Sequence, residues 1–256
     1  MLKAVDYNDK QHAGYVQGRD WGTDHARQWV RIMAAHAPEN RPLTVLDLGS
    51  GTGRFTSLLA ETFCGEAIGV EPSDQMRRIA VERTNHPRVR FLPGKAEAVP
   101  LDDQSVDIVL MFLSLHHVRD RAAAAAEIAR VLRPGGRLFV RSAFSHAWRA
   151  TEFDWHAFFP RARDIEIEMF PTLEEVEDLF AGVGLRRTAL IQTREQVAET
   201  LEEQARRLHF RAISTFEHMT EDEVQAGFAR LDAAVAADPK AGPICCFSDL
   251  LVLGGY

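Results

Sequence analysis

Short apolar runs alternate with helix-patterned segments along most of the chain. Five runs of strand length stand at residues 43–48, 66–71, 89–92, 106–112 and 137–141. The segments between them repeat apolar residues at helical spacing, as Phe55, Leu59 and Phe63 do after the first run. This alternation predicts right-handed crossovers and a parallel sheet with helices on both faces.

Capping residues mark the ends of two predicted helices. Ser73 is a suitable N-cap for a helix that runs to about Thr84, and Asp120 for a helix that runs to Leu132. The proline-glycine-glycine sequence at 134–136 should end the second of these helices.

The alternation loosens after the fifth run. A helix is expected over 172–181, and further strands over 185–192 and 244–253. The stretch between these two strands, about 196–237, has an apolar helical face. We interpret it as a helical insertion on the sheet and as a candidate lid. Residues 1–42 carry one clear helical segment.

Composition and charge are those of an ordinary globular protein. The 256 residues are 46% hydrophobic and 26% charged, which excludes a disordered or fibrous protein. Thirty Lys and Arg residues face 37 Asp and Glu residues, a formal net charge of −7. Proteins that hold a phosphate backbone by charge have the opposite sign, so nucleic acid is not an expected partner. No apolar stretch reaches the roughly 20 residues of a membrane helix, so no membrane insertion is expected.

The three cysteines, Cys64, Cys245 and Cys246, are too few for a disulfide framework. The first residues carry charge where a secretion signal needs an apolar run. We therefore expect a reduced, cytoplasmic protein.

The sequence has no zinc-binding spacing of Cys or His, so no metal site is predicted. The oligomeric state stays open, a homodimer included.

The most informative segment is a strand, a glycine-rich turn and the start of a helix, with the sequence VLDLGSGTGRFT at 45–56. Glycine permits positive φ angles and lets a ligand approach the backbone closely. A dinucleotide-binding fingerprint requires a third glycine at position 54, where this chain has Arg54. Asp47, just before the turn, would repel a pyrophosphate and favour a cationic or amino-bearing ligand.

Glu71 ends the second predicted strand, 18 residues after Gly53. A carboxylate at this place accepts hydrogen bonds from ribose hydroxyls in nucleoside-binding folds. Glu71 therefore indicates a ribose, without distinguishing a nicotinamide dinucleotide from another nucleoside cofactor.

Several motifs in order give the chain a specific resemblance. They are VLDLGSGTGRFT (45–56), VEPSDQM (70–76), PGKAEAVPLDDQSVDIV (93–109), SLHHV (114–118) and EIARVLRPGGRLFV (127–140), with a weaker continuation in PTLEEVEDLFAGVGL (171–185). With them the chain resembles the class I S-adenosylmethionine-dependent methyltransferases of the small-molecule, ubiquinone-biosynthesis-like group. The resemblance implies S-adenosylmethionine as cofactor and a metabolite or natural product as acceptor. It also implies an α/β fold, a Rossmann-like seven-stranded, mostly parallel sheet in the order 3-2-1-4-5-7-6 with strand seven antiparallel and a helical insertion between strands six and seven.

The resemblance also assigns cofactor-binding roles. The expected positions are Asp47, Gly49, Ser50, Gly51 and Gly53 around the methionine part, Glu71 at the ribose, Pro72 and Met76 beside the adenine, Ala96 and Glu97 along its edge, Phe112 and Leu113 near the sulfonium, and Tyr15 and Arg19 over the cofactor carboxylate. One departure concerns the adenine, because many relatives have Asp where this chain has Lys95. A lysine cannot accept a hydrogen bond from the adenine amino group.

We expect a single methyltransferase domain over residues 1–256. Its predicted parts are an N-terminal helical cap (1–42), a cofactor-binding core (43–142), an aromatic-rich insertion (143–170) and a helical lid (196–242).

Methyl transfer by in-line displacement depends on alignment more than on acid–base groups. No catalytic triad is visible, and the candidates for a catalytic base are His116, His117 and His146. The candidates for a substrate pocket are Phe144, Trp148, Trp155, His156, His209 and Arg211. Ordinary packing of the aromatic residues, and a solvated helix face for the basic ones, are the competing interpretations.

Three other functions stay open. A nucleic-acid methyltransferase usually carries an Asp/Asn/Ser-Pro-Pro-aromatic string after strand four, where this chain reads Phe112-Leu113-Ser114-Leu115. A nicotinamide-dependent oxidoreductase is opposed by Arg54 and Asp47. A non-catalytic homologue that keeps the fold would often have lost the glycine loop, which is intact here.

Overall fold

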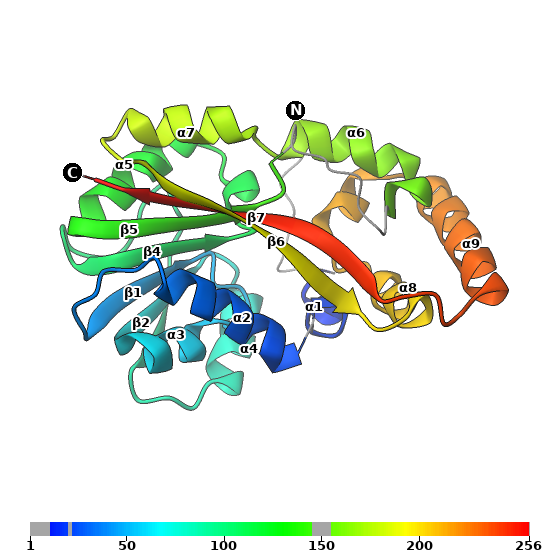
Figure 1. Ribbon diagram of the computed structural model, residues 1–256, viewed down its shortest axis with the longest axis horizontal. Helices are drawn as coiled ribbons and strands as arrows, with labels where there is room; N and C mark the ends of the chain where they lie inside the picture. The colour runs from blue at the N-terminus through cyan, green and yellow to red at the C-terminus, as the bar shows by residue number, and fades with distance from the viewer. Residues whose placement is uncertain (1–10, 20–21, 145–154, 256) are drawn as a thin grey trace. The chain divides into compact units, whose positions relative to one another are not determined.

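The computed structural model describes residues 11–19, 22–144 and 155–255. Within them, seven strands form one sheet in the order β3-β2-β1-β4-β5-β7-β6 (Figure 1). The pairs β3–β2, β2–β1, β1–β4 and β4–β5 are parallel, whereas β5 pairs antiparallel with β7. The predicted fold class, strand order and antiparallel seventh strand are confirmed.

Each strand overlaps one predicted apolar run, although β2, β5 and β6 are longer than predicted. The strands are β1 (Leu43–Leu48), β2 (Cys64–Glu71), β3 (Val89–Pro93), β4 (Val106–Phe112), β5 (Leu132–Ser142), β6 (Arg186–Ala198) and β7 (Ile244–Gly254). The central strands β1 and β4 are buried over almost their whole length, because helices cover both faces of a parallel sheet.

Most helices fall where the apolar spacing and the caps place them, but α1 and α6 were not predicted. They are α1 (Gln11–Arg19), α2 (Gly22–Ala34), α3 (Thr56–Phe63), α4 (Asp74–Arg83), α5 (Arg121–Val131), α6 (Pro160–Met169), α7 (Leu173–Ala181), α8 (Leu201–His209) and α9 (Glu221–Ala237), with short 3-10 helices η1 (Leu115–His117), η2 (Trp155–Ala157) and η3 (Ser214–His218). The Ser73 side chain caps α4 by accepting from Met76 N, and Asp120 caps α5 by accepting from Ala123 N, as predicted.

The chain divides into two compact units, each made from several stretches. The sheet unit comprises residues 22–142, 174–191 and 249–256, and the helical unit comprises the rest. Strands β6 and β7 pass through both units, because the boundaries at 191 and 248 fall inside them. Compactness alone does not decide how many domains fold independently, so the single methyltransferase domain stays a prediction.

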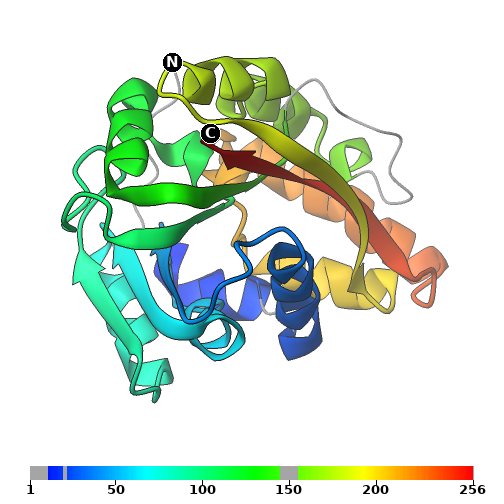
Figure 2. The ribbon, with the colours of Figure 1, turned by 60° about the vertical axis from the view of Figure 1, so that its left-hand side comes forward.

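The sheet unit has three layers. Helices α2, α3 and α4 cover one face of the sheet, and α5 and α7 cover the other (Figures 1 and 2). Its core is built from fully buried aromatic and aliphatic side chains. Members include Trp29, Val30, Met33, Leu43, Val45, Leu59, Phe63, Ile108, Leu110, Phe139, Leu250 and Val252.

The helical unit has its own core, in which aromatic rings meet edge to face. Phe159 packs at 5.2 Å from both Phe216 and Phe228, measured between ring centroids. Gly227 of α9 allows this packing, since a Cβ atom there would lie 2.1 Å from the Phe159 ring. Leu201, Leu208 and further apolar residues complete this core.

Within the helical unit, α1 packs against the end of α8 and the residues after it through two glycines spaced by four. A Cβ atom on Gly14 would lie 2.4 Å from the Phe210 carbonyl oxygen, and one on Gly18 would lie 2.5 Å from Ala212 Cβ. Real Cβ atoms do not approach so closely, so only glycine lets the two backbones come together here. Gly14 and Gly18 therefore mark the packing surface of α1, which the sequence analysis did not predict.

Three predicted boundaries are wrong in instructive ways. The proline-glycine-glycine sequence at 134–136 lies within β5, which begins at Leu132, and a register shift accommodates it between the pairs Val106–Leu132 and Ile108–Arg137. Strand β2 begins two residues earlier than predicted. Strand β6 runs on to Ala198, so the expected helical stretch begins at Leu201 instead of 196.

Candidate functional site

The glycine-rich turn joins the carboxyl end of β1 to α3. Gly49, Gly51 and Gly53 have φ angles of 78°, 55° and 73°, in the left-handed region that favours glycine. Gly49 N donates to Val70 O at 2.8 Å, which ties the turn to the end of β2. A Cβ on Gly49 would lie 2.6 Å from Ser114 Cβ, whereas a Cβ on Gly51 would meet no described atom within 4 Å. The turn is therefore packed at its start and open at Gly51.

Asp47 lies beneath this turn as a buried carboxylate. It is 4% exposed, and its Oδ2 accepts a 2.7 Å hydrogen bond from Thr56 Oγ1 at the start of α3. Burial raises the pKa of Asp47 from 3.8 to about 6; the Thr56 hydrogen bond lowers it, the Glu71 charge raises it and Arg54 lowers it. Asp47 is therefore an acid whose charged form is costly in the ligand-free protein.

Glu71 is the second buried carboxylate, and backbone donors hold it in place. Its Oε2 accepts from Gly51 N at 2.9 Å and its Oε1 accepts from Ser73 N at 2.8 Å. Burial raises the pKa of Glu71, and these two hydrogen bonds act in the opposite direction. The predicted ribose carboxylate and the predicted glycine loop are thus in direct contact.

The predicted adenine-side residues differ in exposure. Met76 and Ala96 are buried, and Pro72 is exposed. The Glu97 carboxylate accepts from the backbone N–H groups of Arg119 and Asp120 at 3.2 and 3.4 Å. Glu97 therefore helps to hold the start of α5, a contact that the sequence did not indicate.

Three aromatic rings and one buried guanidinium group pack together at the carboxyl ends of β4 and β5. Phe112 stacks on Phe55 at 4.5 Å and meets the edge of Trp29 at 5.6 Å. The Arg141 guanidinium lies 4.7 Å from the centre of the Trp29 ring, and Arg141 is only 2% exposed. Leu113 has a φ of 52°, and its N–H donates to Arg141 O. Arg141 was not among the predicted site residues, although a charge inside the apolar run LFVRS was a visible signal.

The predicted catalytic histidines separate into two groups. His116 and His117 form the 3-10 helix η1 after β4, with their ring centres 3.9 Å apart. His146 lies outside the described residues, as does Trp148 among the substrate-pocket candidates.

The other candidates belong to the helical unit. Tyr15 and Arg19 are on α1, and Phe144 is buried. Trp155 packs against Phe159 and Phe216 at 5.5 and 5.6 Å. His156 Nε2 lies 2.9 Å from the buried Glu166 carboxylate of α6. The sequence analysis did not predict this contact. Their cofactor and substrate roles stay predictions.

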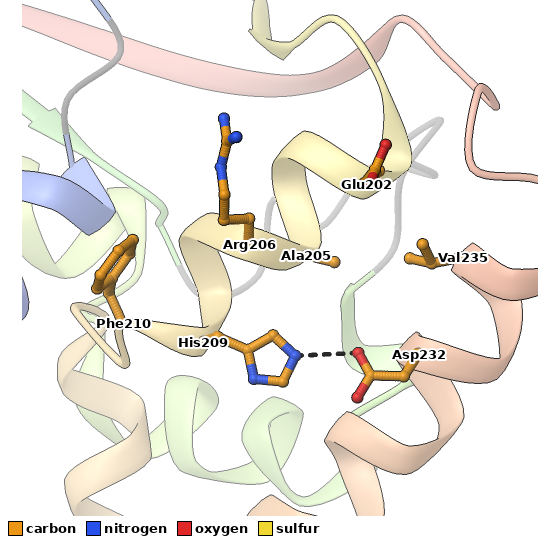
Figure 3. Close-up of a pocket in the computed structure, with 7 residues that line it drawn as sticks. All are labelled: Glu202, Ala205, Arg206, His209, Phe210, Asp232 and Val235. Carbon is orange, nitrogen blue, oxygen red and sulfur yellow. Dashed lines mark hydrogen bonds and ion pairs between the residues drawn. The ribbon is translucent and has the colours of Figure 1, made fainter.

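A cavity of about 470 Å³ lies between α8 and α9 (Figure 3). Its lining residues are Glu202, Ala205, Arg206, His209, Phe210, Asp232 and Val235. His209 Nε2 lies 2.9 Å from Asp232 Oδ1, and the His209 ring stacks on Phe228 at 4.1 Å. Arg211 does not line this cavity, because both of its terminal nitrogens bind the Glu221 carboxylate at 2.8 Å.

The fold and the glycine turn together define a class. The turn lies at the carboxyl end of β1, next to β4, where the strand order reverses, which is where open α/β sheets bind ligands. Two buried acids, Asp47 and Glu71, bracket it. The protein is therefore an α/β protein with a Rossmann-like sheet and two buried acids at the edge where such sheets bind ligands.

Comparison with known proteins gives the family. A family model described as a methyltransferase domain matches residues 46–140. An uncharacterized methyltransferase of Mycobacterium bovis is 43% identical over 124 residues, which are 48% of this chain and 46% of the relative. A ubiquinone/menaquinone biosynthesis C-methyltransferase of Xylella fastidiosa is 30% identical over 184 residues, covering 63% of this chain and 73% of the relative. The chain belongs to the class I S-adenosylmethionine-dependent methyltransferase family.

A solved structure extends the likeness over most of the chain. A putative methyltransferase from an antibiotic biosynthesis pathway of Anabaena variabilis superposes with a TM-score of 0.70 at 21% identity, covering 88% of this chain and 96% of that one. S-adenosylmethionine is the cofactor of the family.

The chain spans about half the length, 46%, of the mycobacterial relative it matches. None of the helices in the described ranges combines the length and apolar character that a bilayer crossing requires.

Proposed function

We propose that this protein transfers a methyl group from S-adenosylmethionine to a small-molecule metabolite or natural product. One observation carries the proposal: two buried carboxylates, Asp47 and Glu71, bracket the turn at the open Gly51 position. Buried acids repel a diphosphate and attract a cationic group. A nucleoside with an amino group and a positive sulfur fits this set of side chains, whereas a dinucleotide does not.

The proposed roles follow from the contacts. Asp47 binds the amino end of the cofactor, and its pKa of about 6 falls when that cation arrives. Glu71 exchanges its bonds from Gly51 N and Ser73 N for bonds from the ribose hydroxyls, or shares them. Met76 and Ala96 supply apolar surface beside the adenine. Lys95 cannot accept from the adenine amino group, so Glu97 and the Ala96 backbone are the proposed partners there.

The chain contributes alignment to the reaction. When bound, S-adenosylmethionine supplies a methyl group on a sulfonium whose departure requires no protonation. Holding the reacting atoms about 3–3.5 Å apart and in line provides several kcal/mol of the barrier reduction. We assign the apolar wall of the reaction site to Phe112, the last residue of β4, and to Leu113, which follows it.

The acceptor is proposed to be a small molecule. The formal net charge of −7 supports this class over nucleic acid, as does the name of the Xylella relative. We propose that the helical unit selects the acceptor, since it lies outside the matched methyltransferase domain. A cytoplasmic location agrees with the three free cysteines, and a homodimer is retained as part of the proposal.

Two measurements test the proposal. Calorimetric titration with S-adenosylhomocysteine should show 1:1 binding, whereas NAD should give no heat of binding. Incubation with S-adenosylmethionine labelled on the methyl group and fractionated small metabolites should label a protease- and nuclease-resistant product. Binding of NAD in place of S-adenosylhomocysteine, or label found only in nucleic acid, would contradict it.

A further inference from the structure

The cavity between α8 and α9 is formed by the helical unit. All of its lining residues belong to that unit, and no described residue of the sheet unit lines it. Helix α8 and the residue after it form one wall, and α9 forms the other (Figure 3). Its volume of about 470 Å³ is within the range of small-molecule sites, ~300–1,000 Å³. The helical unit can therefore hold a small ligand with its own side chains.

Two opposite charges on α8 line this cavity without pairing with each other. Glu202 and Arg206 are four residues apart with the acid first, the order that favours an ion pair on a helix. The next two residues at this spacing, Glu203 and Arg207, do form an ion pair, at 2.7 Å. Neither side chain of the first two has a hydrogen-bond or ion-pair partner among the described residues, and Figure 3 draws no bond between them. One carboxylate and one guanidinium are therefore available to a ligand.

A histidine–aspartate contact joins the two walls. His209 Nε2 lies 2.9 Å from Asp232 Oδ1, and the imidazole stacks on the Phe228 ring with 14° between the two planes. A carboxylate only accepts hydrogen bonds, so a neutral His209 donates from Nε2. The second oxygen of Asp232 has no partner among the described residues. The contact therefore orients the Asp232 carboxylate and leaves one of its oxygens available to a ligand.

Apolar side chains lie beside these charges. Ala205 and Val235 line the cavity, and so does the Phe210 ring, which is 41% exposed. A ligand group that covers this ring removes apolar surface of both molecules from water, which favours binding. The cavity therefore offers an apolar surface together with its carboxylates and its guanidinium.

The set of charges discriminates between classes of ligand. With the imidazole neutral, the cavity has two carboxylates and one guanidinium. A simple carboxylate would meet the guanidinium but also lie beside two negative charges, and a simple amine would lie beside the positive one. A zwitterion with neighbouring ammonium and carboxylate groups matches both, because an ammonium donates three hydrogen bonds and a guanidinium binds a carboxylate with two.

We propose that this cavity binds a free amino acid with an apolar or aromatic side chain. Glu202 and Asp232 bind its ammonium group, Arg206 binds its carboxylate, and its side chain covers the Phe210 ring. This site is additional to the proposed methyl transfer and does not depend on it, since the cofactor candidates around the glycine turn are in the sheet unit.

The test uses the full chain saturated with S-adenosylhomocysteine, so that a free amino acid cannot occupy the place of the cofactor's own amino-acid end. Titration with L-phenylalanine and with L-leucine should be saturable. It should shift the backbone amide NMR signals of residues 201–210 and 228–237. N-acetyl-L-phenylalanine lacks the ammonium group and 2-phenylethylamine lacks the carboxylate, so each should bind about tenfold or more weakly than L-phenylalanine.

Variants test the assigned partners. Arg206→Gln and Glu202→Gln should each lower the affinity for L-phenylalanine about 10- to 100-fold. Both positions are exposed, so thermal stability and affinity for S-adenosylhomocysteine should stay at the parent's values. Arg163→Gln is the matched control, because Arg163 is an exposed arginine of α6 that does not line the cavity. Its affinity for L-phenylalanine should stay within twofold of the parent's.

Four outcomes would overturn the proposal. They are no saturable binding of either amino acid, shifts confined to the sheet unit, equal affinity for all three phenyl probes, and unchanged affinity in the Arg206 and Glu202 variants. Equal affinity for the phenyl probes would mean that only the apolar surface is recognised. A parent protein that does not bind S-adenosylhomocysteine would overturn the proposed methyl transfer instead, and the same titration without it would still decide this site.

Discussion

Asp47 is a buried carboxyl group whose charged form lowers the stability of the folded protein. Its pKa is about 6 in the folded protein against an ordinary 3.8, so the folded protein binds the proton more tightly. The stability contributed by the protonated form is complete below the unfolded value and is lost as the pH rises through about 6. At neutral pH the charged form therefore costs about 3 kcal/mol.

Asp47→Asn should remove this cost. We expect the variant to be more stable than the parent by about 1–3 kcal/mol at pH 8, with the difference shrinking as the pH falls below 6. Urea unfolding at several pH values measures it. Binding of S-adenosylhomocysteine should fall in the same variant, because the amino end of the ligand loses its charged partner. A variant less stable than the parent at pH 8 would contradict the explanation.

Gly51 offers a second test at the scale of one residue. Gly51→Ala places a methyl group in open space at φ 55°, so its strain should cost about 1 kcal/mol. Gly135, at φ 78° and also without a described neighbour within 4 Å, provides the matched control. Both alanine variants should lose similar stability, but only Gly51→Ala should lose at least about tenfold in affinity for S-adenosylhomocysteine by calorimetry. Equal affinities would place the ligand elsewhere.

At this scale the sequence indicated the groups whose chemistry is local. Asp47 and Glu71 were predicted as acids beside a glycine turn, and the structure brings them to that turn. Arg141 and Glu166 were not predicted. Both are charged residues in the interior, and their surroundings come from elements distant in the sequence, which no local pattern encodes.

Among the elements, α1 is defined by the glycines that let it approach the end of α8. Gly18→Val should force the two backbones apart and weaken this docking by about 1–3 kcal/mol. Gln17→Val on the same helix, at an exposed position, is the control for β-branching. Hydrogen exchange in residues 11–19 should accelerate in the first variant and stay close to the parent in the second. Similar exchange in both would show that α1 does not depend on this contact.

The element boundaries show where sequence patterns stop being informative. Strand β4 was predicted to the residue, because Val106 and the apolar residues from Ile108 to Phe112 follow the polar turn sequence 102–105, as a buried strand does. Strand β6 was cut short after Gln192. After Gln192, exposed and buried residues alternate, as they do in a half-buried strand. Two of the buried residues, Thr193 and Glu195, are polar, so the hydrophobic pattern of the sequence does not show this alternation.

At the scale of the molecule, each unit has its own core. We propose that the sheet unit binds the cofactor and that the helical unit selects the acceptor. Phe228 lies in the core of the helical unit, in contact with Phe159 and Phe216. Phe228→Leu should lower turnover with an acceptor more than it lowers affinity for S-adenosylhomocysteine. The comparison of kcat/KM with calorimetric affinity measures this difference. An equal loss in both quantities would show that the helical unit is scaffold for the cofactor site.

The interleaving of the two units sets a condition on how this enzyme can be re-engineered. Five junctions separate them along the chain, and two of these fall inside β6 and β7. No single crossover with a related gene can exchange the helical unit whole. A chimera must swap three stretches at once and preserve strand register at two splice points, so point substitutions are the more practical way to vary the unit to which we assign acceptor selection.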